Sequence, residues 1–132
     1  MTLEFKSEEN GMSIELEYGK LNISGNADNG FRPFQLLVAS IASCSAMVFR
    51  KILTKQRISI DDLKVTAEVE RNEEEANRVE RMTLSFVVYG NQLNEKRLQK
   101  NLMLARKNCA MIRSVEGSID IQETLLIVNT TN

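Results

Sequence analysis

The stretch from Pro33 to Phe49 constrains the fold most, because it carries no charged side chain. A helix that is apolar on all sides belongs inside a core, since none of its faces can meet water over a large sector. Pro33 suits the first helical turn, where its missing N–H would have no intrahelical partner in any case. The sequence therefore predicts a buried central helix that begins at Pro33 and ends near Gln56.

A stripe of small side chains runs along this predicted helix. Ala39, Ser43 and Ala46 follow the spacing i, i+4 and i+7 and so share one face. Small residues let another backbone approach closely. We therefore expect a second helix against this face, supplied by the same chain or by its own copy in a dimer.

Length and charge exclude several classes of protein. A chain of 132 residues with 17 basic and 18 acidic side chains suits one domain over residues 1–132. The net charge of −1 provides no electrostatic footprint for nucleic acid or for an anionic membrane. The first residues resemble no export signal, and polar residues such as Gln35 and Ser40 interrupt the uncharged run. We expect a cytoplasmic protein that does not span a membrane.

The remaining patterns indicate strands on both sides of the helix. Apolar and polar residues alternate within residues 2–24, which predicts a small antiparallel meander. The same alternation over 63–69 and 82–89 predicts a long hairpin with a charged tip at 71–78. An amphipathic helix over 94–108 and a final strand or strand pair over 119–128 complete an α+β domain.

Only two residues offer nucleophilic chemistry of a recognisable kind, Cys44 and Cys109. With two cysteines and no histidine, the chain lacks both Cys/His zinc patterns and histidine-dependent triads. Each cysteine on its own is favoured as a small packing residue. A reactive thiolate needs a nearby cation, and Arg32 lies about 18 Å of straight helix from Cys44, so the two would meet across a dimer or through a folded-back loop.

Cys109 has a more basic sequence environment than Cys44. Arg106, Lys107 and Arg113 lie within four residues of it. Nearby positive charge favours the thiolate form, and this pattern would make Cys109 the thiol with the lower pKa.

The helix sequence from Pro33 to Ala46 resembles the motif of the OsmC/Ohr family, the osmotically inducible protein C and organic hydroperoxide resistance proteins. That motif reads approximately Pro-x-Glu-Leu-Leu-x-Ala-x-x-x-x-Cys-x-Ala, with Cys44 at the cysteine position. A long strand pair and an amphipathic helix ending at Cys109 follow in the family's order. The resemblance covers most of 33–128 and is nearest to the short OsmC-like branch.

The resemblance implies an intertwined α+β homodimer in which antiparallel sheets wrap the buried central helices. It also implies a peroxidase that needs no metal or bound cofactor. Cys44 would be the peroxidatic thiol, which reduces an organic hydroperoxide and becomes a sulfenic acid. Cys109 would be the resolving thiol, and a dithiol or a lipoylated protein would reopen the resulting disulfide.

The sequence departs from the family pattern at several positions. Gln35 occupies the position of the motif glutamate, which in the family holds an arginine on the peroxidatic sulfur. Arg32 is the only arginine before Pro33 and is therefore the one candidate for that cation. The family's Cys-Pro-Val-His is here Cys109-Ala110-Met111-Ile112.

Three functions remain open from the sequence. The first is the hydroperoxide-reducing enzyme. The second is a non-catalytic or redox-sensing dimer that binds an apolar ligand near Phe34 and Met47, with peroxidase activity lost together with the glutamate. The third is a structural dimer in which both cysteines only pack.

Overall fold

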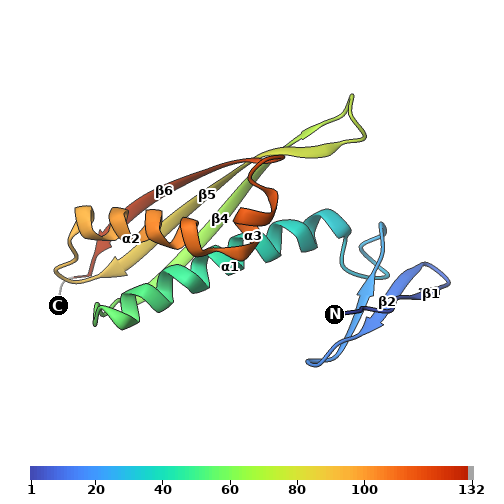
Figure 1. The fold of residues 1–132 in the computed structure, drawn as a ribbon, viewed down its shortest axis with the longest axis horizontal. Coiled ribbons are helices and arrows are strands. Elements are labelled where there is room, and N and C mark those ends of the chain that lie inside the picture. Colours follow the sequence, from blue (N-terminus) through green and yellow to red (C-terminus); the bar gives the residue numbers. More distant parts are fainter. Residues whose placement is uncertain (131–132) are drawn as a thin grey trace. The chain divides into compact units, whose positions relative to one another are not determined.

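The computed structural model describes residues 1–130 and divides the chain into two compact units, Met1–Ala39 and Ser40–Asn132. Helix α1 (Pro33–Lys55) begins within the first unit and continues into the second (Figure 1). The single domain expected over 1–132 stays a prediction.

The first unit contains a three-stranded antiparallel sheet, as the sequence predicts for residues 2–24. Its strands are β1 (Lys6–Glu8), β2 (Gly11–Glu15) and β3 (Lys20–Ile23), in the order β1-β2-β3. Gly11 lies so near β3 that an added Cβ would be 2.1 Å from the carbonyl oxygen of Ile23. The first strand begins at Lys6, which pairs with Ser13, and it ends at Glu8, which pairs with Gly11 across a two-residue turn.

The polar loop before α1 is held by short-range hydrogen bonds. The backbone N–H of Asp28 donates to the side chain of Asn26 at 2.9 Å, and Asn26 N–H donates to Ser24 Oγ at 3.1 Å. Phe31 then returns to β3 by donating to the carbonyl of Asn22 at 2.9 Å. Asx and Ser turns of this kind give a loop without periodicity a defined conformation.

The second unit is built on a mixed sheet in the order β4-β5-β6. Its strands are β4 (Asp62–Asn72), β5 (Arg78–Gly90) and β6 (Asp120–Asn129). The β4–β5 hairpin is antiparallel, as expected, but β6 pairs with β5 in parallel, which corrects the expectation of purely antiparallel sheets. A parallel neighbour requires a crossover, and α2 (Glu95–Asn108) and α3 (Ala110–Val115) provide it.

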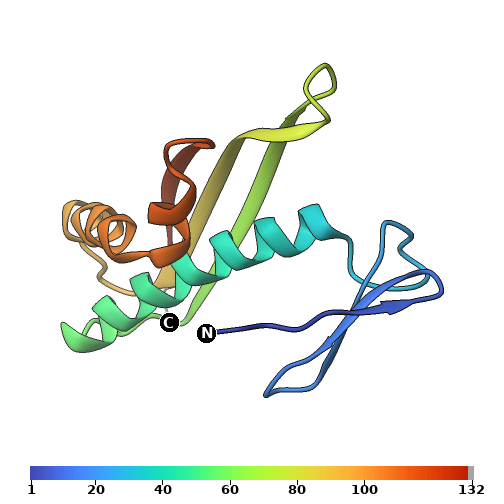
Figure 2. The ribbon, with the colours of Figure 1, turned by 45° about the vertical axis from the view of Figure 1, so that its right-hand side comes forward.

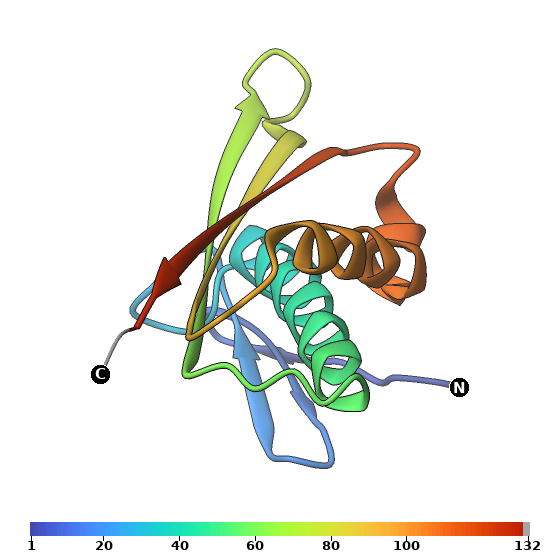
Figure 3. The same cartoon turned by 90° about the vertical axis from the view of Figure 1, so that its left-hand side faces the viewer.

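One face of this sheet is covered by helices (Figure 3). Side chains at alternate positions of β5 are fully buried: Met82, Leu84, Phe86 and Val88. The ring of Phe49 in α1 meets Phe86 edge-on, with centroids 5.7 Å apart. Both α1 and α2 reach the same β6 residue, Glu123, so they pack on the same side of the sheet.

Helix α1 is buried on one stripe, not all round. Ile41, Ser45, Phe49 and Leu53 are its buried residues, whereas Met47 is 65% exposed. The predicted wrapping of α1 and the predicted homodimer therefore remain predictions. By length and hydropathy α1 could also cross a bilayer, a property that core helices of soluble proteins share.

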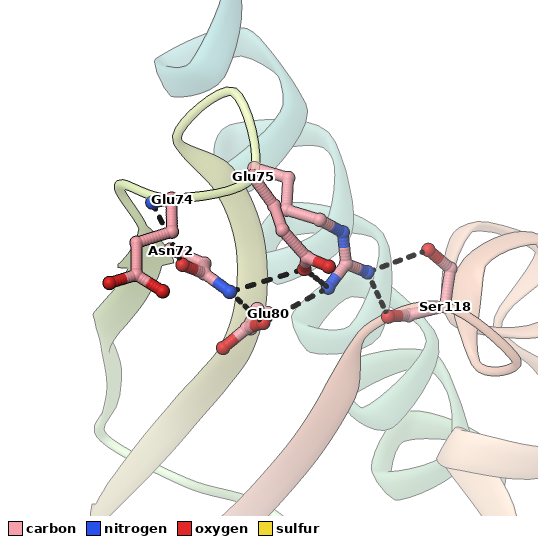
Figure 4. A network of polar contacts seen from close by, with 6 residues as sticks. Asn72, Glu74, Glu75, Glu80 and Ser118 are labelled. Carbon is pink, nitrogen blue, oxygen red and sulfur yellow. Dashed lines mark hydrogen bonds and ion pairs between the residues drawn. The ribbon is translucent and has the colours of Figure 1, made fainter.

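The β4–β5 hairpin extends beyond α2 and α3 (Figure 2), and polar contacts connect its tip to the turn before β6 (Figure 4). Arg78 donates to the carbonyl and hydroxyl oxygens of Ser118, at 2.6 and 3.1 Å. The same guanidinium pairs with Glu80 at 3.4 Å, and Asn72 bonds both Glu75 and Glu80. This arrangement matches the solvated hairpin tip that the charges of 71–78 predict. The strands β4 and β5 extend further toward the tip than the alternation over 63–69 and 82–89 indicates.

Candidate functional site

Cys44 lies in α1, on the flank of its buried stripe. The residue at i−3, Ile41, and the next residue, Ser45, are both buried, while Cys44 itself is half-buried. The preceding Ser43 is exposed. Cys44 therefore lies at the edge of the apolar interior, between the buried stripe and the exposed face of α1.

Cys109 lies at the junction of two helices. It ends α2 and begins α3 in an extended conformation, with φ −86° and ψ 110°. Its N–H donates to the carbonyl of Arg106 at 3.4 Å. The side chain is completely buried. The amphipathic helix that ends at the second cysteine, as predicted, is confirmed, and Asn94 caps its start by accepting from Arg97 N–H.

The fold brings the two thiols together, although 65 positions separate Cys44 and Cys109 in the chain. Both cysteines are free, and the Cys44 thiol lies close enough to Cys109 to contribute to the raised pKa of that thiol. Each sulfur therefore has the other as a close neighbour before any disulfide has formed.

Burial raises the pKa of the Cys109 thiol above its usual value of 9.0. Removal from water disfavours the thiolate, which is the largest cause, and the contact with Cys44 acts in the same direction. The N–H groups of Ile112 and Met111 oppose the shift without reversing it. The expectation that the basic residues near Cys109 lower its pKa is wrong.

The basic residues near Cys109 in sequence have other partners in space. Arg106 pairs with Glu123 at 3.4 Å, and Arg113 pairs with Glu116 at 3.0 Å. Lys107 is exposed to solvent. These three residues therefore lower the pKa of Cys109 less than their positions in the sequence suggest. A guanidinium paired with a carboxylate, or a solvated ammonium, stabilises a buried thiolate only weakly.

A polar cluster with a buried carboxylate includes sequence neighbours of both cysteines, and the sequence reasoning missed it. We call Ser45, Arg106 and Glu123 the Glu123 cluster. The side chain of Glu123 is 7% exposed; it accepts from Ser45 Oγ at 3.0 Å and pairs with Arg106. Its signal in the sequence is a charged residue at an inward position of the alternation that runs from Ile121 to Ile127.

The other predicted site residues near the helix start belong to the first unit. The guanidinium of Arg32 lies over the ring of Phe34, 4.8 Å from its centroid, and both residues are half-buried. Gln35 is exposed. Met47, in the second unit, is exposed on α1. The roles that the resemblance gives to these four residues stay predictions.

A hollow lies between α1 and α2 in the second unit. Its volume is about 470 Å³, and Val48, Ile52 and Leu104 contribute apolar lining beside Lys51 and Lys55. Within residues 1–130, no group of three or more His, Cys, Asp or Glu side chains is placed to hold a metal ion.

Comparison with known proteins places these features in context. Residues 25–124 match the sequence profile of a family described as OsmC-like protein. The chain is 27% identical to Protein YhfA of Escherichia coli strain K12 over 108 residues, which cover 80% of this chain and 81% of YhfA.

Solved structures share the fold at low sequence identity. A hypothetical protein from Aquifex aeolicus VF5 superposes with a TM-score of 0.86 at 23% identity, over 98% of this chain and 97% of that one. OsmC of Legionella pneumophila, titled an organic hydroperoxide resistance protein, gives a TM-score of 0.71 at 21% identity, over 96% and 97% of the two chains. These likenesses extend over almost the whole of each chain.

Proposed function

This chain belongs to the OsmC-like protein family, and we propose that it is a thiol-dependent peroxidase that reduces organic hydroperoxides in oxidative stress defence. Family membership links it to proteins of hydroperoxide resistance, such as the Legionella structure. One observation supports the proposal beyond family membership: Cys44 and Cys109, 65 positions apart in sequence, lie close enough for the Cys44 thiol to affect the pKa of Cys109.

The proposed reaction uses the two sulfurs in turn. The Cys44 thiolate attacks the terminal oxygen of the hydroperoxide, the O–O bond breaks, and the alcohol leaves after taking up a proton. Cys44 is then a sulfenic acid. The Cys109 sulfur attacks the Cys44 sulfur, water leaves, and a disulfide remains. An external dithiol, free or as a lipoyl group on a protein, reduces this disulfide and is itself oxidised.

The environments of the two thiols support this division of roles. Cys44 is half-buried, whereas Cys109 is fully buried, so Cys44 is the thiol that is better placed to meet a peroxide first. The raised pKa of Cys109 keeps it protonated at neutral pH, which suits a thiol that reacts second.

Further parts of the proposal come from the family resemblance. We assign Arg32 as the cation that stabilises the Cys44 thiolate, with Gln35 as its hydrogen-bonding partner in place of a glutamate. Phe34 and Met47 would contact the organic part of the substrate. The protein would act in the cytoplasm as a homodimer, in keeping with the exposed small residues of α1, Ala39 and Ser43.

A stoichiometric oxidation tests the chemistry directly. One equivalent of an organic hydroperoxide should link Cys44 to Cys109 with the loss of two hydrogens, measured by intact and peptide mass spectrometry. Turnover with a dithiol should disappear in Cys44→Ser, while Cys109→Ser should accumulate the sulfenic acid. Native thiols that do not react with peroxide would instead favour the structural dimer in which the cysteines only pack.

The hollow between α1 and α2 favours a second candidate, a non-catalytic or redox-sensing protein that binds an apolar ligand. Its apolar lining and two flanking lysines suit a hydrophobic molecule with an anionic end. Saturable binding of a fatty acid to the Cys44→Ser/Cys109→Ser double variant, without peroxide turnover by the native protein, would identify this function.

A further inference from the structure

Glu123 breaks the pattern of the surface on which it lies. In β6 the inward positions carry Ile121, Leu125 and Ile127, and the residue opposite Glu123 in β5 is the buried Leu84. A carboxylate among these side chains gives up most of its hydration, which is costly unless it is paired and hydrogen-bonded. An apolar residue would fit the alternation of the strand better, and such local exceptions concentrate at functional sites.

Both oxygens of this carboxylate have partners, and the partners come from different helices. Ser45 Oγ in α1 donates to Oε2 at 3.0 Å, and Arg106 Nη1 in α2 lies 3.4 Å from Oε1. Ser45 is completely buried, so its hydroxyl has little access to water as an alternative partner. Glu123 therefore ties α1 and α2 to one point of the sheet.

These two attachment points adjoin the two cysteines. Ser45 directly follows Cys44, and successive residues of an α-helix are rotated by about 100° about its axis. Holding the Ser45 side chain on Glu123 therefore fixes the direction in which Cys44 points. Arg106 lies one turn before Cys109, and its carbonyl accepts the Cys109 N–H.

We infer that Glu123 is a positioning residue which, through Ser45 and Arg106, holds the sulfurs of Cys44 and Cys109 in the mutual orientation required for disulfide closure. Its carboxylate oxygens are engaged by Ser45 and Arg106, so it acts through these residues and not on the reacting atoms. The inference rests on the proposed function only in treating the two cysteines as a disulfide-forming pair.

Closure can be measured without peroxide. With dipyridyl disulfide, the thiolate of the half-buried Cys44 attacks the S–S bond and expels one thiopyridone. Cys109 then attacks the mixed disulfide and expels the second, which forms the Cys44–Cys109 disulfide. The second release is unimolecular, so its rate reports how well the two sulfurs are oriented.

Glu123→Leu should slow this second release by about tenfold, since small misplacements of reacting atoms have large effects on rate. Ser45→Ala should slow it in the same direction, and it tests the inference if Glu123→Leu does not fold. Glu123→Gln, which can still accept from Ser45, should recover part of the rate.

Gln56→Ala is the matched control. Gln56, the residue after α1, and the buried Asn101 exchange two amide hydrogen bonds, at 2.8 and 2.9 Å, and so connect the end of α1 to α2 away from the cysteines. Gln56→Ala should lower the midpoint of urea unfolding but leave the rate of disulfide closure between Cys44 and Cys109 unchanged. Closure at the native rate in folded Glu123→Leu and Ser45→Ala would overturn the inference. Rapid closure without peroxide turnover in the native protein would instead overturn the proposed function alone.

Discussion

Strand β6 carries two acidic residues, Asp120 and Glu123, whose ion pairs have opposite surroundings. Asp120 lies 3.0 Å from Arg81, and the two side chains are 48% and 53% exposed. Glu123 lies 3.4 Å from Arg106, but the glutamate side chain is only 7% exposed. The exposed pair of Asp120 and Arg81 has the shorter contact, so distance alone is a poor guide to how much each pair contributes to stability.

The difference follows from solvation. An exposed pair gains little because water screens both charges whether or not they meet. A buried carboxylate depends on its partners, since removing them leaves a charge without hydration or compensation. We therefore expect the pair at Asp120 to be nearly dispensable and the Glu123 cluster to tolerate replacement only as a unit.

Removing Arg106 should give the largest effect on stability. Arg106→Met leaves the Glu123 carboxylate buried with Ser45 as its only described partner. Because Arg106 is itself 35% exposed, we reduce the value typical of a fully buried pair and expect a loss of about 2 kcal/mol in the free energy of unfolding. Urea denaturation at neutral pH measures it.

Arg81→Met is the matched control for this substitution on the exposed side of β6. It should cost less than about 1 kcal/mol. Equal losses for Arg81→Met and Arg106→Met would show that burial of Glu123 does not distinguish the two pairs.

Replacing the whole Glu123 cluster should separate stability from positioning. In the triple variant Ser45→Ala/Arg106→Met/Glu123→Leu, no charge or hydroxyl remains without a partner in the apolar layer. Its stability should return to within about 1 kcal/mol of the native protein, because apolar replacements of buried ion pairs are often neutral. Its rate of disulfide closure, measured with dipyridyl disulfide, should remain low.

A triple variant that regains both stability and native closure would show that Cys44 and Cys109 are oriented by packing alone. A triple variant as unstable as Arg106→Met would show that the loss arises from the volume of the arginine side chain and not from its charge.

Elements with strong periodicity could be predicted from the sequence. The alternation over 82–89 located β5, and the amphipathic pattern over 94–108 located α2, because burial of one face leaves a periodic signal. The parallel pairing of β6 could not be predicted, since alternation shows which side chains face inward but not the direction of the strand. The sequence predicted a helix buried on all sides, whereas α1 is buried along one stripe. An uncharged composition does not show whether other parts of the same chain cover every face of a helix.

The candidate site, too, could be predicted from the sequence only in part. The pairing of Cys44 with Cys109 came from family resemblance, and no local pattern indicates that residues so far apart will meet. The direction of the pKa shift at Cys109 was wrong because sequence neighbours were taken for spatial ones. Glu123 was overlooked because one polar residue within an alternating strand looks like an ordinary exception until its burial is known.

The smallest expected effect concerns the pH dependence of the exposed pair. Hydrogen bonds from Gln122 and Arg81 lower the pKa of Asp120 below its ordinary value of 3.8. A carboxyl group with a lowered pKa in the folded state stabilises that state above its unfolded pKa, and the contribution disappears as pH falls through the folded value. Asp120→Asn should therefore be slightly less stable than the native protein at neutral pH, and the difference should vanish in acid below pH 3.8. Urea titrations of both proteins across this range measure it, and a difference that persists at the acid end would mean that it does not arise from the charge of the Asp120 carboxylate.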